Sequence, residues 1–340
     1  MNELPKAAVV ILNYNGILHL ERFLPSVYNS VYPNLELVLG DNSSTDSSVA
    51  FVKDAFPRVR IIQNDKNYGY AEGYNQVLKQ VDADYFILLN SDVEVTPDWI
   101  GPVIRLMEQD DSIAAAQPKL KSWAYRGQFE YAGAAGGFID RYGYPFCRGR
   151  VFDTLETDTG QYNDFIEVFW ASGAAKFIKK KFWELSGGFD SNFFAHMEEV
   201  DLCWRLKNQG YKIMYCPQSV VYHVGGGTLE AGSPRKTYLN FRNSLAMLQK
   251  NLPPRKAASI IFTRFWLDFA ALLRFVAAGK FKHARAINRA HMDFFRNFSK
   301  NRKAASKVNP KFNTAGIYKG SVVWDYFVRG KKTFGEIISK

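Results

Sequence analysis

Two groups of acidic side chains have the spacing expected of catalytic machinery. The first group, Asp41 and Asp92, follows two short apolar runs that are typical of buried strands. The second group lies at the start of a segment with helical periodicity and consists of Glu198, Glu199 and Asp201. Carboxylates bind Mg²⁺ and Mn²⁺, and they also take protons from reacting hydroxyls. The sequence therefore offers one acidic group for a metal and another for a general base.

The elements that must position these residues alternate along the first 90 residues. Apolar runs predict strands at 8–12, 35–39, 59–63 and 85–89. Amphipathic stretches predict helices at 19–28, 43–56 and 69–80. This alternation, with short connections, predicts an α/β fold with a doubly wound, mostly parallel sheet. In such sheets, ligands bind at the carboxyl ends of the strands.

Polar residues crowd that edge of the predicted sheet. They are Asn13, Tyr14, Asp41, Asn42, Asn90, Ser91 and Asp92. Residues of these types are also common in loops and at helix N-caps, and this simpler interpretation applies equally well to Ser44, Thr45 and Asp46. Because Asp41 and Asp92 come at the ends of apolar strands, ligand binding is favoured for them.

Composition limits the class of protein. A chain of 340 residues with 47% hydrophobic and 15% aromatic residues is long enough for one or two folded domains. The three cysteines are odd in number and lack metal-ligand spacing, so we expect a reducing compartment, the cytosol, and no disulfide framework. The N-terminus has neither the basic start nor the cleavage site of a signal peptide, and we expect no export.

The C-terminal third is strongly basic. Residues 231–340 contain 23 Lys and Arg against 4 Asp and Glu, whereas residues 1–230 carry a net charge of −8. Helices are predicted at 257–278 and 280–298, and three charges within the first of them argue against a membrane span. We expect this helix to lie in the interface of an anionic membrane, with packing against the body as the alternative. No recognition motif accompanies the charge, so no nucleic acid is expected.

Four motifs in order along the chain carry a family resemblance. They are Val9 to Gly16, Asp41 to Asp46, Asn67-x-Gly69…Gly73-x-Asn75, and Leu88 to Asp92. Together they resemble the nucleotide-binding half of family 2 glycosyltransferases with the GT-A fold, and the resemblance continues through Phe169 to Gly227. The chain is similar to bacterial rhamnosyltransferase-like enzymes of surface polysaccharide assembly. This implies a nucleotide-sugar-binding half at 1–120, an acceptor-binding half at 121–235 and a basic amphipathic helical extension at 236–340.

The resemblance implies a donor site for a dTDP-, UDP- or GDP-linked sugar. Its donor-binding residues would be Asn13, Tyr14, Asp41, Asn42, Asn75, Asn90 and Ser91. Asp92 occupies the third position of the family's Asp-x-Asp metal motif, and His223 matches the histidine that completes the metal site in many members. Mn²⁺ or Mg²⁺ would then bridge the two phosphates. The glycines at 225–227 and Thr228 suit a lid over the donor phosphates.

The resemblance also implies an acceptor site and a reaction. Glu199 matches the catalytic base, and the acceptor-binding residues would be Trp170, Gly173, Glu198 and Asp201. On a helix, Asp201, Arg205 and Asn208 share one face. The implied activity is inverting, metal-dependent sugar transfer, for instance of rhamnose, to a glycan or lipid-linked acceptor. The implied location is cytoplasmic, peripheral on the inner face of the cell membrane.

Two other classes of function share some of these features. A nucleotidyltransferase would also have the alternating fold and a metal, but it usually carries a basic, Gly-rich phosphate loop after its first strand, and residues 13–16 contain no basic residue. A noncatalytic carbohydrate- or nucleic-acid-binding protein would explain the aromatic residues and the basic charge without needing Asp92 or Glu199. Turnover of a sugar donor would distinguish an enzyme from such a binding protein.

Overall fold

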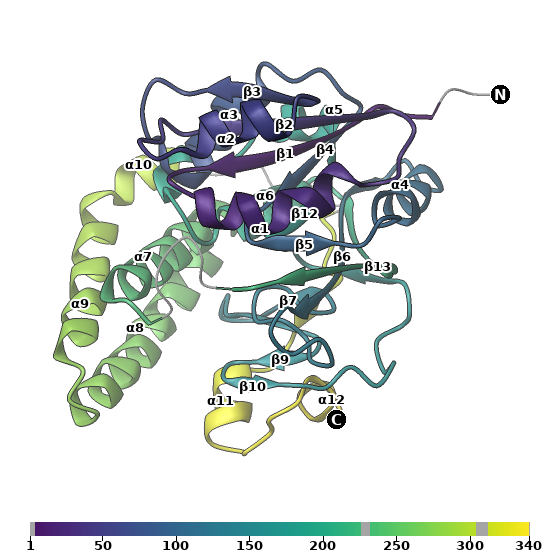
Figure 1. Cartoon of the computed structure of the whole chain (residues 1–340). Coiled ribbons are helices and arrows are strands. Elements are labelled where there is room, and N and C mark those ends of the chain that lie inside the picture. Colours follow the sequence, from purple (N-terminus) through teal and green to yellow (C-terminus); the bar gives the residue numbers. More distant parts are fainter. Residues whose placement is uncertain (1–3, 226–231, 304–311, 340) are drawn as a thin grey trace.

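The computed structural model describes residues 4–225, 232–303 and 312–339, and the lid expected at 225–228 therefore lies largely outside the described residues. In the N-terminal half, strands and helices alternate as predicted (Figure 1). The parallel strands there are β1 (Ala7–Asn13), β2 (Leu35–Asp41), β3 (Val59–Gln63) and β4 (Tyr85–Leu89). The α/β class and the parallel pairing of this half are confirmed.

The main sheet continues into the second half of the chain with mixed strand directions. Within the described residues it has nine strands, in the order β11-β13-β6-β12-β4-β1-β2-β3, with β5 paired to β13. The added strands are β5 (Val93–Val95), β6 (Ile113–Ser122), β11 (Ile166–Val168), β12 (Ala175–Lys179) and β13 (Lys212–His223). β12 runs antiparallel to both β4 and β6, so it joins the two halves into one sheet.

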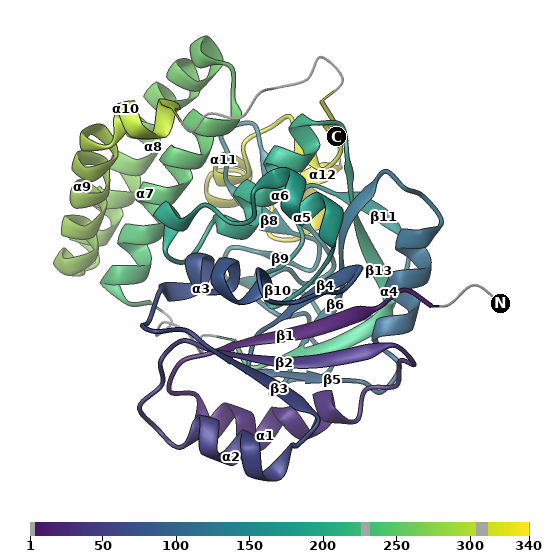
Figure 2. The ribbon, with the colours of Figure 1, turned by 90° about the horizontal axis from the view of Figure 1, so that it is seen from above.

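Helices cover both faces of this sheet (Figure 2). One face packs against α1 (Ile17–Tyr28), α2 (Ser48–Ala55) and α4 (Ile100–Glu108). The other face packs against α3 (Gly69–Leu78), α5 (Lys180–Ser186) and α6 (Glu198–Asn208). Along β1, alternate residues enter the two apolar clusters because successive side chains of a strand point to opposite faces.

The predicted helix at 43–56 begins late, at Ser48. The preceding residues form a turn that side chains hold in place. Asp41 Oδ2 accepts a hydrogen bond from the Ser44 amide at 2.9 Å, and Asp46 Oδ1 accepts one from the Ser48 amide at 3.1 Å. Because Asp and Ser side chains compete for backbone groups in this way, the helix starts only where the turn ends.

A smaller sheet lies beside the main one and includes the chain's C-terminal part. It has the order β10-β9-β8-β7-β14 among the described residues. Its strands are β7 (Gly137–Asp140), β8 (Pro145–Cys147), β9 (Arg150–Val151), β10 (Thr154–Leu155) and β14 (Ile317–Tyr318). Two short helices, α11 (Val322–Phe327) and α12 (Phe334–Ile338), follow β14. Phe334 packs on Phe138 and Phe146, so the last residues belong to the body.

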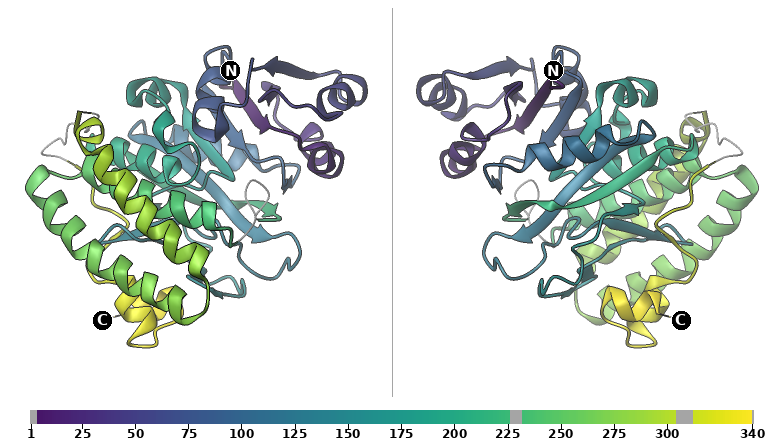
Figure 3. Two further views of the ribbon diagram at one scale, coloured as in Figure 1. Left: turned by 90° about the vertical axis from the view of Figure 1, so that its left-hand side faces the viewer. Right: turned by 90° about the vertical axis from the view of Figure 1, so that its right-hand side faces the viewer.

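Three long helices form the flank of the molecule away from the N-terminal strands (Figure 3). They are α7 (Pro234–Asn251), α8 (Pro254–Ala277) and α9 (Phe281–Arg296), followed by α10 (Phe298–Lys303). No helix in the described part of the chain combines the length and apolar character needed to cross a bilayer. We call α7, α8 and α9 the helical flank.

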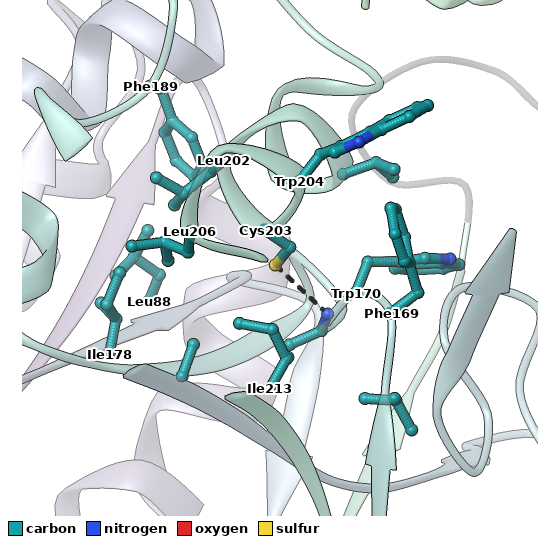
Figure 4. Close-up of a cluster of buried hydrophobic side chains, with 14 of the residues drawn as sticks. Leu88, Phe169, Trp170, Ile178, Phe189, Leu202, Cys203, Trp204, Leu206 and Ile213 are labelled. Atoms are coloured by element: carbon teal, nitrogen blue, oxygen red, sulfur yellow. Dashed lines mark hydrogen bonds between the residues drawn. The ribbon is translucent and has the colours of Figure 1, made fainter. Parts of the chain in front are cut away.

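An apolar core lies between α6 and the main sheet and sets the distance between them. Figure 4 shows Leu202, Cys203 and Leu206 of α6 facing the sheet, with Trp204 beside Phe169. Cys203 Sγ lies 3.5 Å from the Ala171 amide nitrogen. Among the described residues the cysteines are all buried and free, which confirms the expectation of no disulfide framework.

Candidate active site

A cavity of about 430 Å³ opens where the main sheet, the small sheet and the helical flank meet. Seven of the residues expected to form the site line it: Asn90, Asp92, Trp170, Gly173, Glu198, Glu199 and His223. They come from four segments of the sequence. The structure therefore gathers the expected metal residues and the expected base around a single volume.

Strand pairing brings Asp92 and His223 together. β5 and β13 run antiparallel with Val93 opposite His223, and His223 Nε2 lies 3.1 Å from Asp92 Oδ1. On the other side of the ring, His223 Nδ1 lies 3.2 Å from Oε1 of Glu130. All three side chains are buried. The imidazole therefore stands between two carboxylates.

Electrostatics at this spot favour positive charge. Burial by itself would lower the pKa of His223, but Glu130 and Asp92 outweigh burial and raise this pKa to about 10. Burial would likewise raise the pKa of Asp92, but His223 holds that pKa below its usual value. The protein thus holds an imidazolium between two carboxylates, which is the electrostatic environment that also suits a bound cation.

Asp92 fits a divalent metal that also contacts substrate phosphates, whereas His223 would have to lose its proton before it could ligate one. Asp92 Oδ2 is buried and has no hydrogen-bond partner among the described residues, which leaves one carboxylate oxygen free to ligate. No group of three or more His, Cys, Asp or Glu side chains in the described residues is arranged to hold a metal by itself. One carboxylate with substrate phosphates and water is a common way of holding Mg²⁺.

Glu198 and Glu199 open α6 and also line the cavity. The Oε2 atom of each is buried without a hydrogen-bond partner in the described residues. Burial and then the charge of Glu199 raise the pKa of Glu198 well above its usual value. Burial also raises the pKa of Glu199, although the nearby Lys176 ammonium opposes the rise. A carboxylate with a raised pKa is a stronger proton acceptor when it is ionised.

The backbone before α6 adopts an uncommon conformation. Phe194, His196 and Met197 all have positive φ angles, of 61°, 68° and 71°. Each such non-glycine residue costs of the order of 1–3 kcal/mol and persists only where the surroundings enforce it. Here Asn243 of α7 donates hydrogen bonds to the carbonyl oxygens of Phe193, Ala195 and His196. The helical flank therefore fixes how α6 presents its first two glutamates.

Gly173 and Trp170 shape the floor between the two acidic groups. The Gly173 carbonyl accepts a hydrogen bond from Tyr70 Oη at 2.8 Å. A Cβ atom on Gly173 would lie 3.1 Å from Tyr70 Oη, so a side chain there would crowd this hydroxyl, whereas its distance of 3.8 Å from the Glu199 Cβ is an ordinary contact. Trp170 is anchored by its Nε1–H, which donates to the Phe138 carbonyl at 2.9 Å.

Four of the residues expected to bind the donor, Asn13, Tyr14, Asp41 and Asn42, lie at the ends of β1 and β2, outside the cavity lining. Asn13 Nδ2 donates to Asp41 Oδ1 at 3.2 Å, and both residues are buried. Asn42 donates to the Gly69 carbonyl at 2.8 Å and so ties β2 to the start of α3. Tyr14 is half exposed at this edge, and Ser91 is partly buried. These side chains hold the shape of the sheet edge.

Two expected site residues are placed away from the cavity. Asn75 bonds to the backbone of Phe189 in both directions, at 2.9 and 3.0 Å, and so joins α3 to the segment before α6. Asp201 is fully buried, 2.9 Å from Arg205 Nε and 3.1 Å from Lys250 Nζ. Asp201 and Arg205 share one face of α6, as predicted, but this face points toward α7 and not toward the cavity. We therefore assign neither residue to substrate binding.

Several cavity residues were given no role by the sequence analysis. They are Tyr70, Glu130, Arg150, His196 and Lys236. Burial and then Lys236 lower the pKa of His196 to about 4, which leaves its ring neutral at physiological pH. Glu130 lies in the Gly- and Tyr-rich stretch that follows β6, where no periodicity or motif marks it. Only the pairing of this stretch with β6, which lies beside β13, brings Glu130 to His223.

Solved structures with similar folds place the chain in a structural class. The TarS fragment 1–349 of S. aureus in complex with UDP-GlcNAc aligns with a TM-score of 0.58 and 15% identity, over 88% of this chain and 84% of that one. The mannosyltransferase PcManGT of Pyrobaculum calidifontis, in complex with GDP-Man and Mn²⁺, aligns with a TM-score of 0.54 and 15% identity, over 89% and 84%. The fold is the GT-A type of the sugar-transferring enzymes.

Sequence comparison gives the family. The profile of glycosyl transferase family 2 matches residues 8–181, just over half of the 340 residues. The N-acetylglucosaminyl-diphospho-decaprenol L-rhamnosyltransferase of Mycobacterium tuberculosis (strain H37Rv) is 27% identical over 242 residues, which are 63% of this chain and 75% of that enzyme. The chain belongs to glycosyl transferase family 2 and is a nucleotide-sugar glycosyltransferase. This sets aside the nucleotidyltransferase and the noncatalytic binding protein.

Proposed function

We propose that this enzyme transfers a sugar with inversion from a dTDP-, UDP- or GDP-linked donor to a hydroxyl of a glycan or lipid-linked acceptor. The observation that carries the proposal is the single cavity that Asp92 and His223 line together with Glu198 and Glu199. Inversion needs both pairs, because the hydroxyl attacks the anomeric carbon opposite the departing diphosphate, so a base serves the acceptor and a metal serves the leaving group.

The residues of the cavity divide the reaction between them. Glu199 takes the proton of the acceptor hydroxyl as that oxygen forms its bond to the anomeric carbon, while the bond from this carbon to the diphosphate oxygen breaks. To join Asp92 in holding Mn²⁺ or Mg²⁺, His223 would have to give up its proton, and the cation would then neutralise the charge that develops on the leaving diphosphate. Lys176 donates to the Glu199 carbonyl at 3.1 Å, and its charge favours the ionised form of the base.

The acceptor side of the cavity suits an anionic or lipid-linked glycan. Lys236 and Arg150 line it and have no carboxylate partner among the described residues. The relative from M. tuberculosis is named for an acceptor that carries a diphosphate and a lipid. We therefore infer assembly of a surface polysaccharide or lipid-linked glycan, with rhamnose as the first donor sugar to test.

We also infer a peripheral location on the cytoplasmic face of an anionic membrane. The outward face of α8 exposes five large apolar side chains at spacings of four and three residues: Phe262, Trp266, Phe269, Leu273 and Val276. The opposite face of the same helix contributes the buried Arg264 to the cavity wall. A membrane against the outward face would therefore lie one helix away from the acceptor site.

The test is a screen of dTDP-, UDP- and GDP-sugars with the full chain. Binding is measured by titration calorimetry with and without Mn²⁺, and each donor that binds is then incubated with a polyprenyl-diphosphate-linked sugar. We expect one nucleotide class to bind in a metal-dependent way and the product to have the opposite anomeric configuration, read by NMR. A product that retains the donor's configuration would contradict the assignment of Glu199 as a base.

A further inference from the structure

A second concave site lies between α7 and α9, away from the catalytic cavity. It is a groove of about 610 Å³ whose described lining contains no acidic residue. Its charged side chains are Arg235, Arg242, Lys282, Arg285 and Arg289. We call this the basic groove. Five cations around one groove repel each other unless an anion lies among them.

The two helices present their cations in the same pattern. On α9, Lys282, Arg285 and Arg289 follow an i, i+3, i+7 spacing, which places them on one face. On α7, Arg235 and Arg242 are seven residues apart and therefore also share a face. The two basic faces belong to helices that pack directly on one another. The charge is thus concentrated in the groove rather than spread over the surface.

The centre of the groove is rigid. The guanidinium groups of Arg242 and Arg289 stack over the ring of Tyr238, 5.4 and 5.2 Å from its centroid. Tyr238 in turn donates from its hydroxyl to Asp293 at 2.8 Å. Asp293 lies at one end, 3.6 Å from Arg289 Nε. These contacts fix the middle of the groove and leave its rim for a ligand.

The rim carries cations that the protein itself does not neutralise. Lys282 and Arg285 are exposed and have neither a hydrogen-bond nor an ion-pair partner among the described residues. Planar guanidinium groups bind phosphate oxygens in a bidentate way. The chemistry of the groove is therefore that of a phosphate-binding site.

The position of the groove indicates where the phosphate comes from. Phe281, which is 66% exposed, opens α9 directly beside Lys282, and the exposed apolar face of α8 ends at Val276, just before it. Apolar side chains next to phosphate-binding cations are what the boundary between acyl chains and headgroups requires. We propose that the basic groove binds the phosphate of an anionic phospholipid headgroup. The proposal rests on the proposed membrane association for its ligand, but not on the proposed transfer reaction.

The experiment compares two doubly substituted full-length proteins in vesicle co-sedimentation. Lys282→Gln with Arg285→Gln removes two charges from the rim of the groove, and Lys53→Gln with Lys79→Gln removes two exposed charges from the N-terminal half. Vesicles are pure phosphatidylcholine or contain 30% phosphatidylglycerol, at low and high salt. Since each basic side chain near an anionic surface strengthens binding about fivefold, we expect the groove variant to bind anionic vesicles roughly 20- to 30-fold more weakly, and the control less than threefold.

Three outcomes would overturn the proposal. The first is an equal loss of vesicle binding in both variants, and the second is a wild-type protein that binds anionic and neutral vesicles equally well. The third is that the groove binds inorganic phosphate or a single-stranded oligonucleotide, while substitution of Lys282 and Arg285 leaves vesicle binding unchanged. Donor turnover in solution is measured on the same preparations. A groove variant with normal donor turnover and weak vesicle binding supports the proposal. If the wild-type protein turns over no donor, this refutes the proposed function alone.

Discussion

Asp92, His223 and Glu130 illustrate how three buried polar side chains can hold a charge for function. His223 Nε2 lies 3.1 Å from Asp92 and Nδ1 lies 3.2 Å from Glu130, yet one oxygen of Asp92 keeps no partner among the described residues. A buried polar atom without a partner costs about 1–3 kcal/mol, which a protein tolerates where a ligand will meet that atom. Glu198 and Glu199 present the same pattern across the cavity.

We expect Asp92→Asn to abolish Mn²⁺-dependent donor binding and turnover while the protein stays folded. The amide keeps the shape of the side chain but removes the charge that a hard cation requires. Glu94→Gln is the matched control, because Glu94 is two residues away and bonds to Trp123 and Arg126 instead. Calorimetric titration with donor, with and without Mn²⁺, makes the measurement. Unchanged metal dependence in Asp92→Asn would refute the metal assignment.

We expect Glu199→Gln to lower the transfer rate by ~10²–10⁴-fold, the range for loss of a general base, with donor affinity nearly unchanged. Glu198→Gln should instead act mainly on the acceptor KM. Because the pKa of Glu199 is raised, the wild-type rate should rise with pH through a value above the usual range for Glu, and this limb should be absent in Glu199→Gln. If Glu198→Gln is the inactive variant, the two roles are reversed.

At the scale of elements, α8 is held to the body by a buried charge network. Asp268 lies 3.3 Å from Arg264 Nε and 3.0 Å from both His291 Nε2 and Tyr144 Oη. The network joins α8 to α9 and to the loop before β8, and Arg264 of the same network lines the cavity. Two of the charges that argued against a membrane span therefore face inward, where each has a partner.

We expect Asp268→Asn to lower the free energy of unfolding by about 3–5 kcal/mol, because it leaves the buried Arg264 charge without its counter-ion. Asp82→Asn, which breaks an exposed ion pair with Lys180, should have a far smaller effect, because solvent screens the pair. Burial by itself would raise the pKa of Asp268, but Arg264 and His291 outweigh burial and lower this pKa. Its contribution is therefore present above the unfolded-state pKa and lost as pH falls through the folded-state pKa. Urea unfolding from neutral to acid pH checks both statements.

At the scale of the whole molecule, charge and apolar surface are divided between the two ends. The acidic body holds the sheet and the catalytic cavity, while the basic residues gather on the helical flank. The two faces of this flank differ, since its inner face lines the cavity and its outer face exposes the apolar side chains of α8. Removing it would also uncover Asp201, which pairs with Lys250 and Asn251. Surface substitutions therefore test the flank better than truncation.

We expect Trp266→Ser combined with Phe269→Ser to weaken binding to vesicles of either charge, while donor turnover in solution stays within twofold of the wild type. Both side chains are at least half exposed and take no part in the cavity. Leu18→Ser with Val31→Ser removes a similar exposed apolar area from the N-terminal half. Vesicle co-sedimentation compares the two. Equal binding by both variants would mean that the exposed face of α8 does not contact the membrane.

The order of elements and the family were determined by the sequence alone. Apolar periodicity is local, so β3 and β4 have the bounds that their residues predicted, and α8 begins three residues before its predicted start. The motifs that end each strand gave the class of enzyme because their order along the chain reflects the order of loops at one edge of a sheet. The roles of Asp92, Glu199 and His223 stay predictions, although the structure gathers these residues around one cavity.

Only the tertiary structure decided which of the polar residues share that cavity. Asp201 is three residues from Glu198, yet it faces α7 and not the cavity, because the direction of a helical side chain depends on which neighbour covers each face. Glu130 has no sequence motif and reaches His223 only because its segment pairs with β6, the neighbour of β13 in the sheet. The basic groove likewise exists because α7 and α9, 46 residues apart at Thr237 and His283, pack side by side. Contacts between distant segments depend on how complete elements pack, and local periodicity does not record this packing.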